Sequence, residues 1–491
     1  MLTDIVTKAR SAQKIWSALP YGKRAAALRG AAKFLASHID DVTEVIHRDN
    51  GKLLLDALAT EALPAILAAG YYIKQGKKFM SPRNIGGRNL LMFNKKSRMV
   101  YGPWGVIGII SPWNYPFAIP FSEVLMALLA GNGVILKTAS VTPNVGRMLE
   151  KIFLSADLPD GLFTFVEIPG AEAGPAFIES GIDKLFFTGS TATGRLLMGL
   201  AAPRLLPLVL ELGGSDGAII CADADLDKAA AGVMWAGFSN AGQSCGGIQR
   251  VLVHRDVYAP FLEKLCALTR SLRLGSGPDC DVGPMTSARQ RDTAQKQIAE
   301  CVRMGATVAA RSPLPEGLGD IFLPAMVLTG VTADMPVMKD EIFGPVVAVV
   351  PVSDDDEAVA MINRSPYGLT GSVWSRSHRR AMGLAMRVNA GAVMVNDHLM
   401  SHGLAETPWG GFGDSGLGRT HGEMGFREML KARVIVDETL PGVKRNLWWQ
   451  PYSEGVYRGM RAITAMVSGG LGAKLRALPG VLGIFFRYWS P

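Results

Sequence analysis

The chain has few cysteines and lacks the patterns that mark secreted or nucleic-acid-binding proteins. Its 491 residues include five scattered cysteines, an odd number that does not suit a disulfide framework, so we expect a reducing compartment. No RNP motif, zinc-finger spacing or long Lys/Arg block occurs, so we expect neither nucleic acid nor a metal ion as a partner. No basic segment followed by an apolar segment begins the chain, so we expect no signal peptide and a cytoplasmic protein.

Composition favours an ordinary α/β protein with an uneven distribution of charge. Apolar residues make up 48% of the chain and charged residues 19%, and the length suffices for about two to four domains. The net charge is +8, with a pI near 9.2. The positive excess is steepest after Gly455, where five basic residues and no acidic residue occur.

The order of the hydrophobic patterns predicts two parallel-sheet domains. Up to about residue 80, apolar residues recur at helical spacing, including a long run over 42–73. From 105–110 onward, short apolar runs alternate with helical patterns, which indicates βαβ units and a Rossmann-like sheet. The alternation restarts after Gly213 and Gly214. We therefore predict an α/β fold with a first domain over 1–84 and 104–213 and a second domain over 214–418.

One thiol lies in a run of small residues. Cys245 follows Ser244 and precedes Gly246 and Gly247. Small neighbours let a substrate and backbone N–H groups approach a thiolate closely, which makes Cys245 a candidate nucleophile. On this stretch alone, an inert buried cysteine is the more common alternative.

Two turns after predicted strands carry candidate binding groups. Asn114 lies between two prolines and could donate its side-chain N–H to an oxyanion, although a Pro-bounded turn explains the same pattern. Gly189 lets the backbone approach a pyrophosphate at the start of a helix, whose free N–H groups favour an anion. Its spacing matches neither the dinucleotide fingerprint nor the P-loop, so an ordinary βα turn is the alternative.

Two acidic residues stand out in apolar surroundings. Glu211 lies in a strand-like run before paired glycines, where burial would bring its pKa toward that of a general base. Glu341 and Phe343 precede a Gly-Pro turn, and an acid and an aromatic ring suit a ribose and a planar base. The alternatives are an edge residue facing water and a loop with a buried Phe.

Together these motifs resemble the aldehyde dehydrogenase family. Six separated motifs occur in the order and spacing of that family, and 408–416 resembles its late Gly-rich loop. The resemblance covers roughly residues 5–440, nearly the whole chain outside the tail. The motifs are Asn114, Lys137, Gly189-Ser190, Glu211, Cys245 and 341–345.

The resemblance implies an NAD(P)-dependent enzyme that oxidises an aldehyde to the free acid through a cysteine thiohemiacetal and thioester. It identifies Cys245 as the nucleophile, Asn114 as the oxyanion donor and Glu211 as the base that activates water. A thioester passed to coenzyme A would not need that base, so a CoA-acylating enzyme is a less favoured alternative. The implied cofactor residues are Trp113, Lys137, Ser140, Gly189, Ser190, Glu341 and Phe343. The resemblance implies that the first domain binds the dinucleotide and that the second domain is catalytic. It also implies an oligomerisation arm of strands over 85–103 and 425–438, and hence a homodimer or homotetramer.

The segment after Lys137 departs from the family pattern, which often ends in Glu where this chain has Ser140. A Glu there would chelate the 2′- and 3′-hydroxyls of the adenosine ribose and repel a 2′-phosphate. Ser140 removes that repulsion and leaves Lys137 available to the phosphate. We therefore expect the cofactor to be NADP or NAD, with NADP favoured.

The residues beside the reactive groups predict an apolar aldehyde. The family lines its aldehyde tunnel with the positions of Tyr115, Ser244, Gly246 and Trp409. Two aromatic and two small residues suggest a roomy apolar tunnel for aliphatic or aromatic aldehydes. Succinic semialdehyde is the alternative, because Gln249-Arg250 or the loop over 398–402 could supply polar contacts.

Residues 439–491 lie outside the family pattern and combine aromatic and aliphatic residues with basic ones. No segment there is long enough to span a membrane without a charge. An amphipathic basic extension with Trp and Tyr suits a membrane surface, which predicts an enzyme peripheral to the inner face of the membrane. The alternative is a tail that packs on its own oligomer or rims the substrate tunnel.

Overall fold

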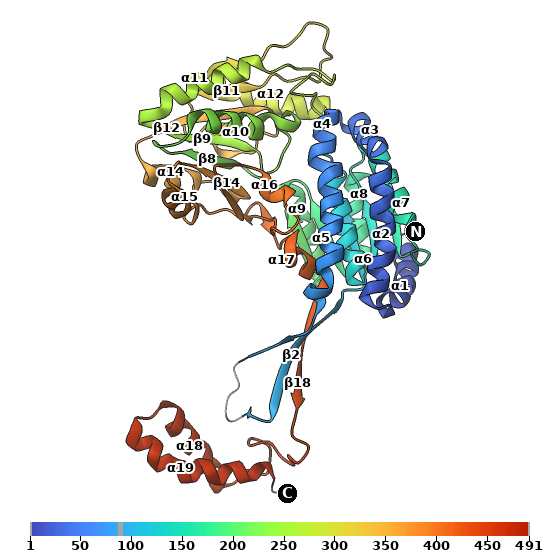
Figure 1. Cartoon of the computed structure of the whole chain (residues 1–491), viewed down its shortest axis with the longest axis vertical. Helices are drawn as coiled ribbons and strands as arrows, with labels where there is room; N and C mark the ends of the chain where they lie inside the picture. The colour runs from blue at the N-terminus through green and yellow to red at the C-terminus, as the bar shows by residue number, and fades with distance from the viewer. Residues whose placement is uncertain (1, 87–91, 490–491) are drawn as a thin grey trace. The chain divides into compact units, whose positions relative to one another are not determined.

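The computed structural model describes residues 2–86 and 92–489, which form two compact units. The larger unit comprises the chain up to Met80 together with Gly102–Lys431. The smaller unit comprises Ser81–Tyr101 and the chain from Ala432 on. The larger unit contains two sheets covered by helices (Figure 1), so the predicted α/β class with two parallel-sheet parts is confirmed.

A six-stranded sheet forms the first part of the larger unit. Its strand order is β17-β7-β6-β3-β4-β5, and all neighbours are parallel except β17, which runs antiparallel to β7. The central strands are buried along their whole length, as expected when helices cover both faces. The strands are β3 (Val106–Ile110), β4 (Gly133–Lys137), β5 (Phe163–Phe165), β6 (Lys184–Thr188), β7 (Leu208–Glu211) and β17 (Gly416–Leu417).

Helices cover both faces of this sheet. Val106 and Ile110 of β3 share a core with α1, α8 and α9. Side chains alternate along a strand, so Ile107 and Ile109 point to the other face, where α6 is buried on every residue. The helices are α1 (Leu2–Ala18), α6 (Ala118–Ala130), α7 (Pro143–Leu154), α8 (Gly170–Glu179), α9 (Thr191–Ala201), the 3-10 turn η3 (Ala202–Arg204) and α17 (Gly422–Glu428).

The N-terminal helices pack outside α6 and α7. The helical run predicted over 42–73 is interrupted, because Gly51 adopts a left-handed φ of 77° and its N–H closes the last turn of α3 on His47 O. Among the described residues, Leu54–Met80 is the one helix long and apolar enough to cross a membrane by length and composition. Tyr72 of this helix is fully buried in the protein. The helices are α2 (Tyr21–Ser37), α3 (Ile39–Asn50), α4 (Leu54–Ala57), the π turn η1 (Leu58–Ala62) and α5 (Leu63–Met80).

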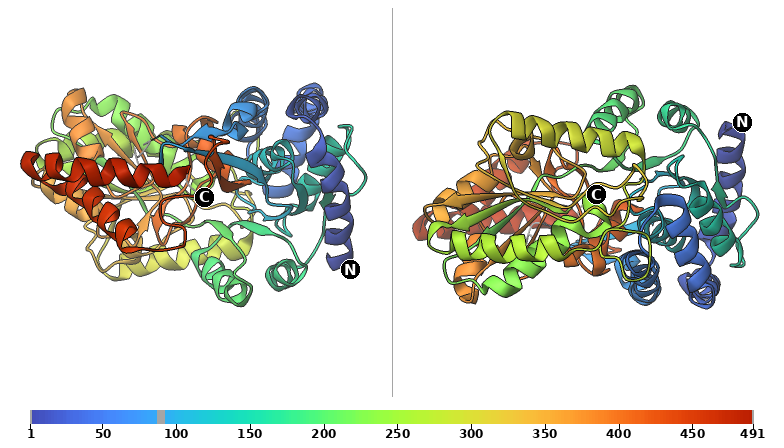
Figure 2. Two further views of the ribbon diagram at one scale, coloured as in Figure 1. Left: turned by 90° about the horizontal axis from the view of Figure 1, so that it is seen from below. Right: turned by 90° about the horizontal axis from the view of Figure 1, so that it is seen from above.

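A seven-stranded sheet forms the second part, with the order β10-β11-β12-β9-β8-β14-β15. Within this sheet, β10 and β11 pair antiparallel, and the other described pairs are parallel. Helices lie on both sides of it, with α12 on one side and α10 and α11 on the other (Figure 2). The strands are β8 (Asp216–Ile220), β9 (Ile248–His254), β10 (Thr307–Arg311), β11 (Met326–Thr329), β12 (Val346–Val352), β14 (Thr370–Trp374) and β15 (Ala392–Val395). The helices are α10 (Leu226–Phe238), η4 (Ser239–Gly242), α11 (Arg255–Ser271), α12 (Ala288–Arg303), α13 (Pro336–Lys339), α14 (Asp355–Ile362), α15 (His378–Ala385) and α16 (Met400–Gly403), and a short ribbon pairs β13 (Tyr367–Gly368) with β16 (Phe412–Gly413).

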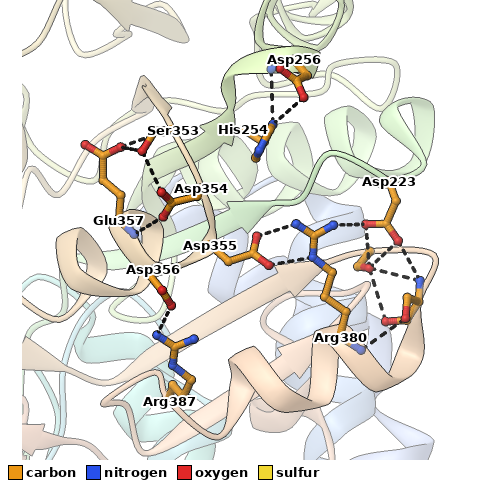
Figure 3. Close-up of polar contacts among 12 residues, drawn as sticks. Asp223, His254, Asp256, Ser353, Asp354, Asp355, Asp356, Glu357, Arg380 and Arg387 are labelled. Atoms are coloured by element: carbon orange, nitrogen blue, oxygen red, sulfur yellow. Dashed lines mark hydrogen bonds and ion pairs between the residues drawn. The ribbon is translucent and has the colours of Figure 1, made fainter.

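One arginine links three segments at an edge of this second part. Arg380 of α15 donates two hydrogen bonds of 2.7 Å to the carboxylate of Asp355 at the start of α14 (Figure 3). The same guanidinium lies 3.3 Å from Asp223, which follows β8 and also accepts from Ser375 Oγ. Bidentate charged hydrogen bonds are among the stronger polar contacts, so this cluster stabilises the junction.

The smaller unit contains a three-stranded sheet with the order β1-β2-β18. The strands are β1 (Arg83–Asn84), β2 (Lys95–Pro103) and β18 (Leu430–Glu438). The bounds differ from the predicted arm, because 83–84 already pair with β2, and 425–428 lie in helix α17. The part of the predicted arm over 87–91 lies outside the described residues.

The tail forms a helical hairpin in the smaller unit. Helix α18 (Glu454–Ser468) begins where Ser453 Oγ accepts a hydrogen bond from Val456 N, and α19 (Leu471–Phe485) follows after two glycines and ends in the turn η5 (Phe486–Tyr488). A small core joins the two helices to Phe93.

Candidate active site

Cys245 lies at the end of a tight loop between α10 and β9. Three successive residues before it, Asn240, Ala241 and Gly242, have positive φ values of 53°, 52° and 68°. A Cβ at Gly242 would lie 2.2 Å from Gly344 O, so only glycine fits there. Strained backbone of this kind is characteristic of functional loops.

Two cavities meet at Cys245. One is lined by apolar and aromatic side chains together with Ser244, and the other by Asn114, Gly189, Ser190, Glu341 and Phe343. Cys245 lines both. A group bound in either cavity can therefore reach the sulfur, as a reaction between two bound molecules requires.

The surroundings keep the Cys245 thiol protonated. Burial raises the pKa of Cys245, and the nearby carboxylates of Glu341, Asp216 and Glu211 raise it further. Because the thiolate is the nucleophilic form, this thiol needs a base or a nearby positive charge before it attacks.

Asn114 is held beside the Cys245 loop by a set of amide hydrogen bonds. Its Nδ2 donates to Gln243 O over 3.1 Å, and its own carbonyl accepts from Asn240 Nδ2 over 3.1 Å. The first contact sets the orientation of the Asn114 amide, since only the NH₂ end can donate to a carbonyl. The second N–H of that NH₂ group remains to donate to a substrate oxygen in the adjoining cavity.

A buried ion pair lies behind the Asn114 segment. Lys52 Nζ and Glu61 Oε1 are 2.6 Å apart, and neither side chain is exposed. Lys52 also donates to Asn114 O over 2.9 Å, and Glu61 Oε2 accepts from Phe117 N over 2.7 Å and from Ala118 N over 3.1 Å. The pair therefore fixes both ends of this segment. Glu61 lies in the π turn η1, a type of helix defect common at functional sites.

Glu211 ends strand β7 with its carboxylate buried. Neither carboxylate oxygen accepts a hydrogen bond from the described residues. Burial raises the pKa of Glu211 well above its usual range, the charge of Glu123 raises it further, and Arg419 lowers it. A Cβ at Gly410 would lie 2.8 Å from Glu211 Oε1, so the glycine leaves room beside the carboxylate. A buried carboxylate with a raised pKa and no hydrogen-bond donor among the described residues suits a general base.

The second cavity fits a dinucleotide. Ser190 caps α9 by accepting from Thr193 N over 3.3 Å, and Gly189 precedes it, so a helix N-terminus is available to phosphate. Glu341 accepts from Gly214 N over 3.1 Å, and burial raises its pKa to about 7. Its second oxygen is then available to ribose hydroxyls. The rings of Trp113 and Phe343 meet edge to face 5.4 Å apart in the same cavity, which suits planar groups.

A further hollow lies at the carboxyl ends of β4 and β5. Ser140 and Glu167 are among its lining residues, and Lys137 ends β4 just before the lining residue Thr138. Arg147 on α7 pairs with Glu167 over 2.9 Å. Nucleotides bind at this end of parallel sheets, so the residues fit an adenosine ribose.

The aldehyde-side cavity is walled by aromatic and aliphatic groups. The Tyr115 hydroxyl bonds to Ser244, and the ring lies under Lys52 Nζ at 4.1 Å. A Cβ at Gly246 would lie 2.8 Å from the Trp409 ring, so glycine makes room for that ring. Among the described residues that line this cavity there is no Arg, Lys, Asp or Glu. The lining is Ala59, Thr60, Pro64, Tyr115, Trp235, Ser239, Ser244, Cys245, Leu399, Met400, His402, Gly403 and Trp409.

The polar residues that could bind a substrate carboxylate lie outside the aldehyde-side cavity or carry no charge near pH 7. Arg250 donates to Ser215 O and Ile362 O in the protein interior, and is absent from the cavity lining. His398 contacts Gly246 O at 2.9 Å. His402 does line the cavity, but burial lowers its pKa to about 4, so it is neutral near pH 7.

Sequence reasoning missed the contribution of the N-terminal helices. Lys52, Glu61 and Pro64 all contact the site or its supporting segment, and Gln290 and Gln297 of α12 line the dinucleotide cavity. The acid in an apolar helix at Glu61 was the one available signal. The other residues occur in stretches that read as ordinary helix.

Comparison with known proteins identifies the family. The model of the aldehyde dehydrogenase family matches residues 2–435. The chain belongs to the aldehyde dehydrogenase family. As an aldehyde dehydrogenase it is an oxidoreductase that acts on small-molecule aldehydes with NAD(P), as the motifs implied.

Two relatives illustrate the range of this aldehyde dehydrogenase's neighbours. The 4,4′-diapolycopene aldehyde oxidase of a Methylomonas species is 36% identical over 470 residues, covering 96% of this chain and 87% of the relative. A protein of Mycolicibacterium smegmatis named succinate-semialdehyde dehydrogenase (NADP+) is 37% identical over 451 residues, covering 90% and 86%.

Solved structures share the fold of this aldehyde dehydrogenase. An aldehyde dehydrogenase structure from Burkholderia cenocepacia is 32% identical, with a TM-score of 0.85, and the match covers 89% of this chain and 92% of that one. A betaine aldehyde dehydrogenase from Staphylococcus aureus, solved with NAD+, is 28% identical, with a TM-score of 0.85 and 91% coverage of both chains.

Proposed function

We propose that this aldehyde dehydrogenase oxidises medium to long apolar aldehydes to free acids, with Cys245 as the nucleophile. The observation that carries the substrate class is the cavity beside Cys245, which is walled by Tyr115, Trp235, Leu399 and Trp409 and has no charged residue among its described lining. An apolar chain gains free energy by leaving water there, whereas a substrate carboxylate would lose its hydration without a cation to replace it.

The proposed roles are those that the family resemblance implies, and the place of Cys245 and Asn114 at one cavity supports them. Cys245 attacks the aldehyde carbon, and the Asn114 side chain and the Cys245 backbone N–H stabilise the resulting oxyanion. Bound NAD(P)+ supplies the acceptor for the hydride that the thiohemiacetal loses. Glu211 then takes a proton from the water that hydrolyses the thioester and releases the acid. Hydrolysis by Glu211 favours the free acid over the CoA ester as product.

Two of the relatives support different substrates. The first, named for an aldehyde of a long hydrocarbon, matches 96% of this chain, which leaves about 20 residues unmatched. The segment 439–491 is longer than that, so the likeness extends into the tail. Succinic semialdehyde is the second candidate, favoured by the name of the Mycolicibacterium relative and disfavoured by the uncharged cavity.

For the cofactor, we propose that NADP+ is preferred. Ser140, which lines the adenosine hollow, and Lys137, which ends the strand before it, support this, since neither repels a 2′-phosphate, and the Mycolicibacterium relative is named for NADP+. The positive charge of Arg147 lies 2.9 Å from the Glu167 carboxylate and opposes the repulsion between that carboxylate and a 2′-phosphate.

We also propose that the three-stranded sheet β1-β2-β18 joins subunits into a homo-oligomer. Strand β18 is at the edge of its sheet and exposes Val434, Ile435 and Val436. An exposed apolar edge strand is a ready partner for another chain. Sedimentation velocity tests this: Val434→Glu with Val436→Glu should lower the mass of the particle, and an unchanged mass would refute it.

The test of the substrate class is a series of straight-chain aldehydes compared with succinic semialdehyde. The value of kcat/KM should rise by up to about fourfold for each added CH₂ until the cavity is filled. Met400→Arg should lower the rate on long aldehydes, whereas Met386→Arg, at an 83% exposed position outside the cavity, should not. A preference for succinic semialdehyde over the straight-chain series would overturn the proposal.

A further inference from the structure

The C-terminal hairpin carries an apolar face that remains exposed. Helices α18 and α19 lie side by side in the smaller unit (Figure 1), and one side of α19 faces away from α18. We call this side the outer face of α19. It consists of four leucines of α19 and of Phe486, which follows α19 as the first residue of η5. Leu471, Leu475, Leu478, Leu482 and Phe486 have the i, i+4, i+7, i+11, i+15 spacing of a single helix face, with exposures of 78%, 65%, 45%, 56% and 74%.

The outer face is a second apolar side on a helix that already has one. Ala477, Val481 and Ile484 form the inner side of α19 and are buried with Ile463 of α18. The two helices approach closely through glycine, since a Cβ at Gly459 would lie 2.8 Å from Ile484 Cβ. A helix that is apolar on two sides is typical of a buried or lipid-contacting segment, so the outer face requires a partner.

The charge around the outer face selects the partner. Residues 439–491 contain seven basic residues and one acidic residue, Glu454, which lies 3.5 Å from Arg458. Lys474 and Arg476 belong to α19 itself and flank the outer face. Their long stems can lie along an apolar surface while the charged ends reach outward. Two copies of so positive a surface repel each other, whereas an anionic surface attracts it.

Exposed aromatic residues accompany the hairpin. Trp448, Trp449, Tyr452 and Trp489 are between 43% and 67% exposed in the same unit. Trp and Tyr are enriched where protein meets the boundary between lipid headgroups and hydrocarbon.

We propose that the outer face of α19 docks on an anionic lipid surface. The leucines and Phe486 enter the headgroup boundary, and Lys474 and Arg476 contact the anionic headgroups. Anionic lipid is abundant on the cytoplasmic leaflet, so the enzyme sits at the inner face of the membrane. This binding goes beyond the proposed function and does not depend on which aldehyde is oxidised.

The test is sedimentation of the full-length enzyme with vesicles of phosphatidylglycerol and phosphatidylcholine in equal amounts. Lys474→Gln with Arg476→Gln should lower the partition coefficient roughly 30-fold, because each basic residue near an anionic surface contributes independently. Leu475→Gln with Leu482→Gln should lower it at least about tenfold. The wild type should bind less as salt is raised and should bind pure phosphatidylcholine weakly.

Matched controls separate docking from misfolding. Leu205→Gln with Met386→Gln removes two residues that are 87% and 83% exposed in the larger unit, and should leave vesicle binding unchanged. All variants should keep wild-type turnover of a short soluble aldehyde. Vesicle binding is measured separately from turnover, so a failure of the substrate proposal does not alter the vesicle-binding result. Wild-type enzyme that stays in the supernatant, or tail variants that pellet like the wild type, would overturn the proposal. A change of oligomeric mass in Leu475→Gln with Leu482→Gln, without vesicle binding by the wild type, would identify the face as a subunit contact instead.

Discussion

Lys52 and Glu61 form a fully buried ion pair with 2.6 Å between Nζ and Oε1, and the two residues hold opposite ends of the segment that carries Asn114. The pair also reaches the wall of the aldehyde cavity, because Lys52 Nζ lies 4.1 Å from the Tyr115 ring and Glu61 follows Thr60 in the chain. Its hydrogen bonds go to the segment that carries Asn114, so we expect its main effect on the reaction to be exerted through the position of Asn114.

Breaking this pair should cost both stability and rate. Lys52→Met leaves the Glu61 carboxylate buried without its cation, which should destabilise the protein by about 3–5 kcal/mol. Asn114→Ala should lower kcat roughly 100- to 1,000-fold by removing one oxyanion donor. If Lys52 acts by positioning Asn114, adding Lys52→Met to Asn114→Ala should reduce kcat little further.

The double variant Lys52→Met with Glu61→Gln is the control for the buried charge. It should recover much of the melting temperature lost in Lys52→Met, because no unpaired carboxylate remains. Full additivity of the kcat losses of Lys52→Met and Asn114→Ala would contradict the positioning role.

Glu211→Gln should separate the two halves of the reaction. With the base for hydrolysis gone, steady-state acid formation should fall by about 100- to 10,000-fold. Rapid mixing should still show a burst of reduced nicotinamide close to one equivalent per subunit, since acylation of Cys245 precedes hydrolysis. Glu211→Asp should regain part of the steady-state rate.

The contrary outcomes for Glu211 are specific. Acid formation at the wild-type rate would remove its role as base. A burst that is itself slowed in proportion would mean that Glu211 also deprotonates the Cys245 thiol, whose pKa is raised by burial. Efficient acyl transfer to added coenzyme A would favour the acylating alternative.

Ser140→Glu should reverse the cofactor preference. A carboxylate in this hollow would repel the 2′-phosphate and bond the ribose hydroxyls, so kcat/KM with NADP+ should fall at least about tenfold while that with NAD+ is kept or rises. Ser140→Gln has a similar size without the charge and should keep the wild-type preference. A wild-type enzyme that strongly prefers NAD+ would refute the reasoning from Ser140.

Glu123→Gln should change the pH dependence of both rate and stability. Burial raises the pKa of Glu123 to about 8, so Glu123 carries the charge that raises the pKa of Glu211 only above about that pH. Glu123→Gln removes this contribution, so the part of the acid limb of the kcat profile that lies above about pH 8 should move to lower pH.

The stability effect has a definite sign. Unfolded Glu123 ionises at its ordinary pKa, whereas the folded group keeps its proton until about pH 8. Between those values the unfolded state holds fewer protons, so the unfolding free energy falls as pH rises, by an amount on the order of a few kcal/mol. Glu123→Gln should flatten the melting temperature between pH 5 and pH 8, and Glu179→Gln, at an exposed position, should not. Equal slopes in all three proteins would contradict the assignment.

The strands of the two parallel sheets could be predicted closely because each is a short apolar run between turn residues. Strand β3 occupies Val106–Ile110, within the apolar run at 105–110 where the alternation was predicted to begin. Helix ends were harder, since a single residue decides them. Gly51 ends α3 inside a run that reads as helix, and α19 continues through Pro479, although proline disfavours a helix interior.

The candidate site also contains residues that could be predicted from the sequence and residues that could not. Cys245, Asn114 and Glu341 line one cavity, which the family resemblance implied and local patterns could not establish. The sequence marks the Lys52–Glu61 pair only through the acid in an apolar helix at Glu61. It does not mark the partners of the pair, which are backbone groups of Asn114, Phe117 and Ala118. Backbone donors and acceptors occur at every residue, so sequence does not mark which of them a distant side chain will contact.

Because Cys245 lines two cavities, the acyl group and the dinucleotide of the proposed reaction would reach the sulfur from different sides. An acyl chain on Cys245 would occupy the cavity of Tyr115 and Trp409 and leave the cavity of Glu341 and Phe343 clear. Reduced dinucleotide could then exchange for oxidised dinucleotide before the acid departs. For a long apolar acid that leaves slowly, dinucleotide exchange would add no further delay to the turnover.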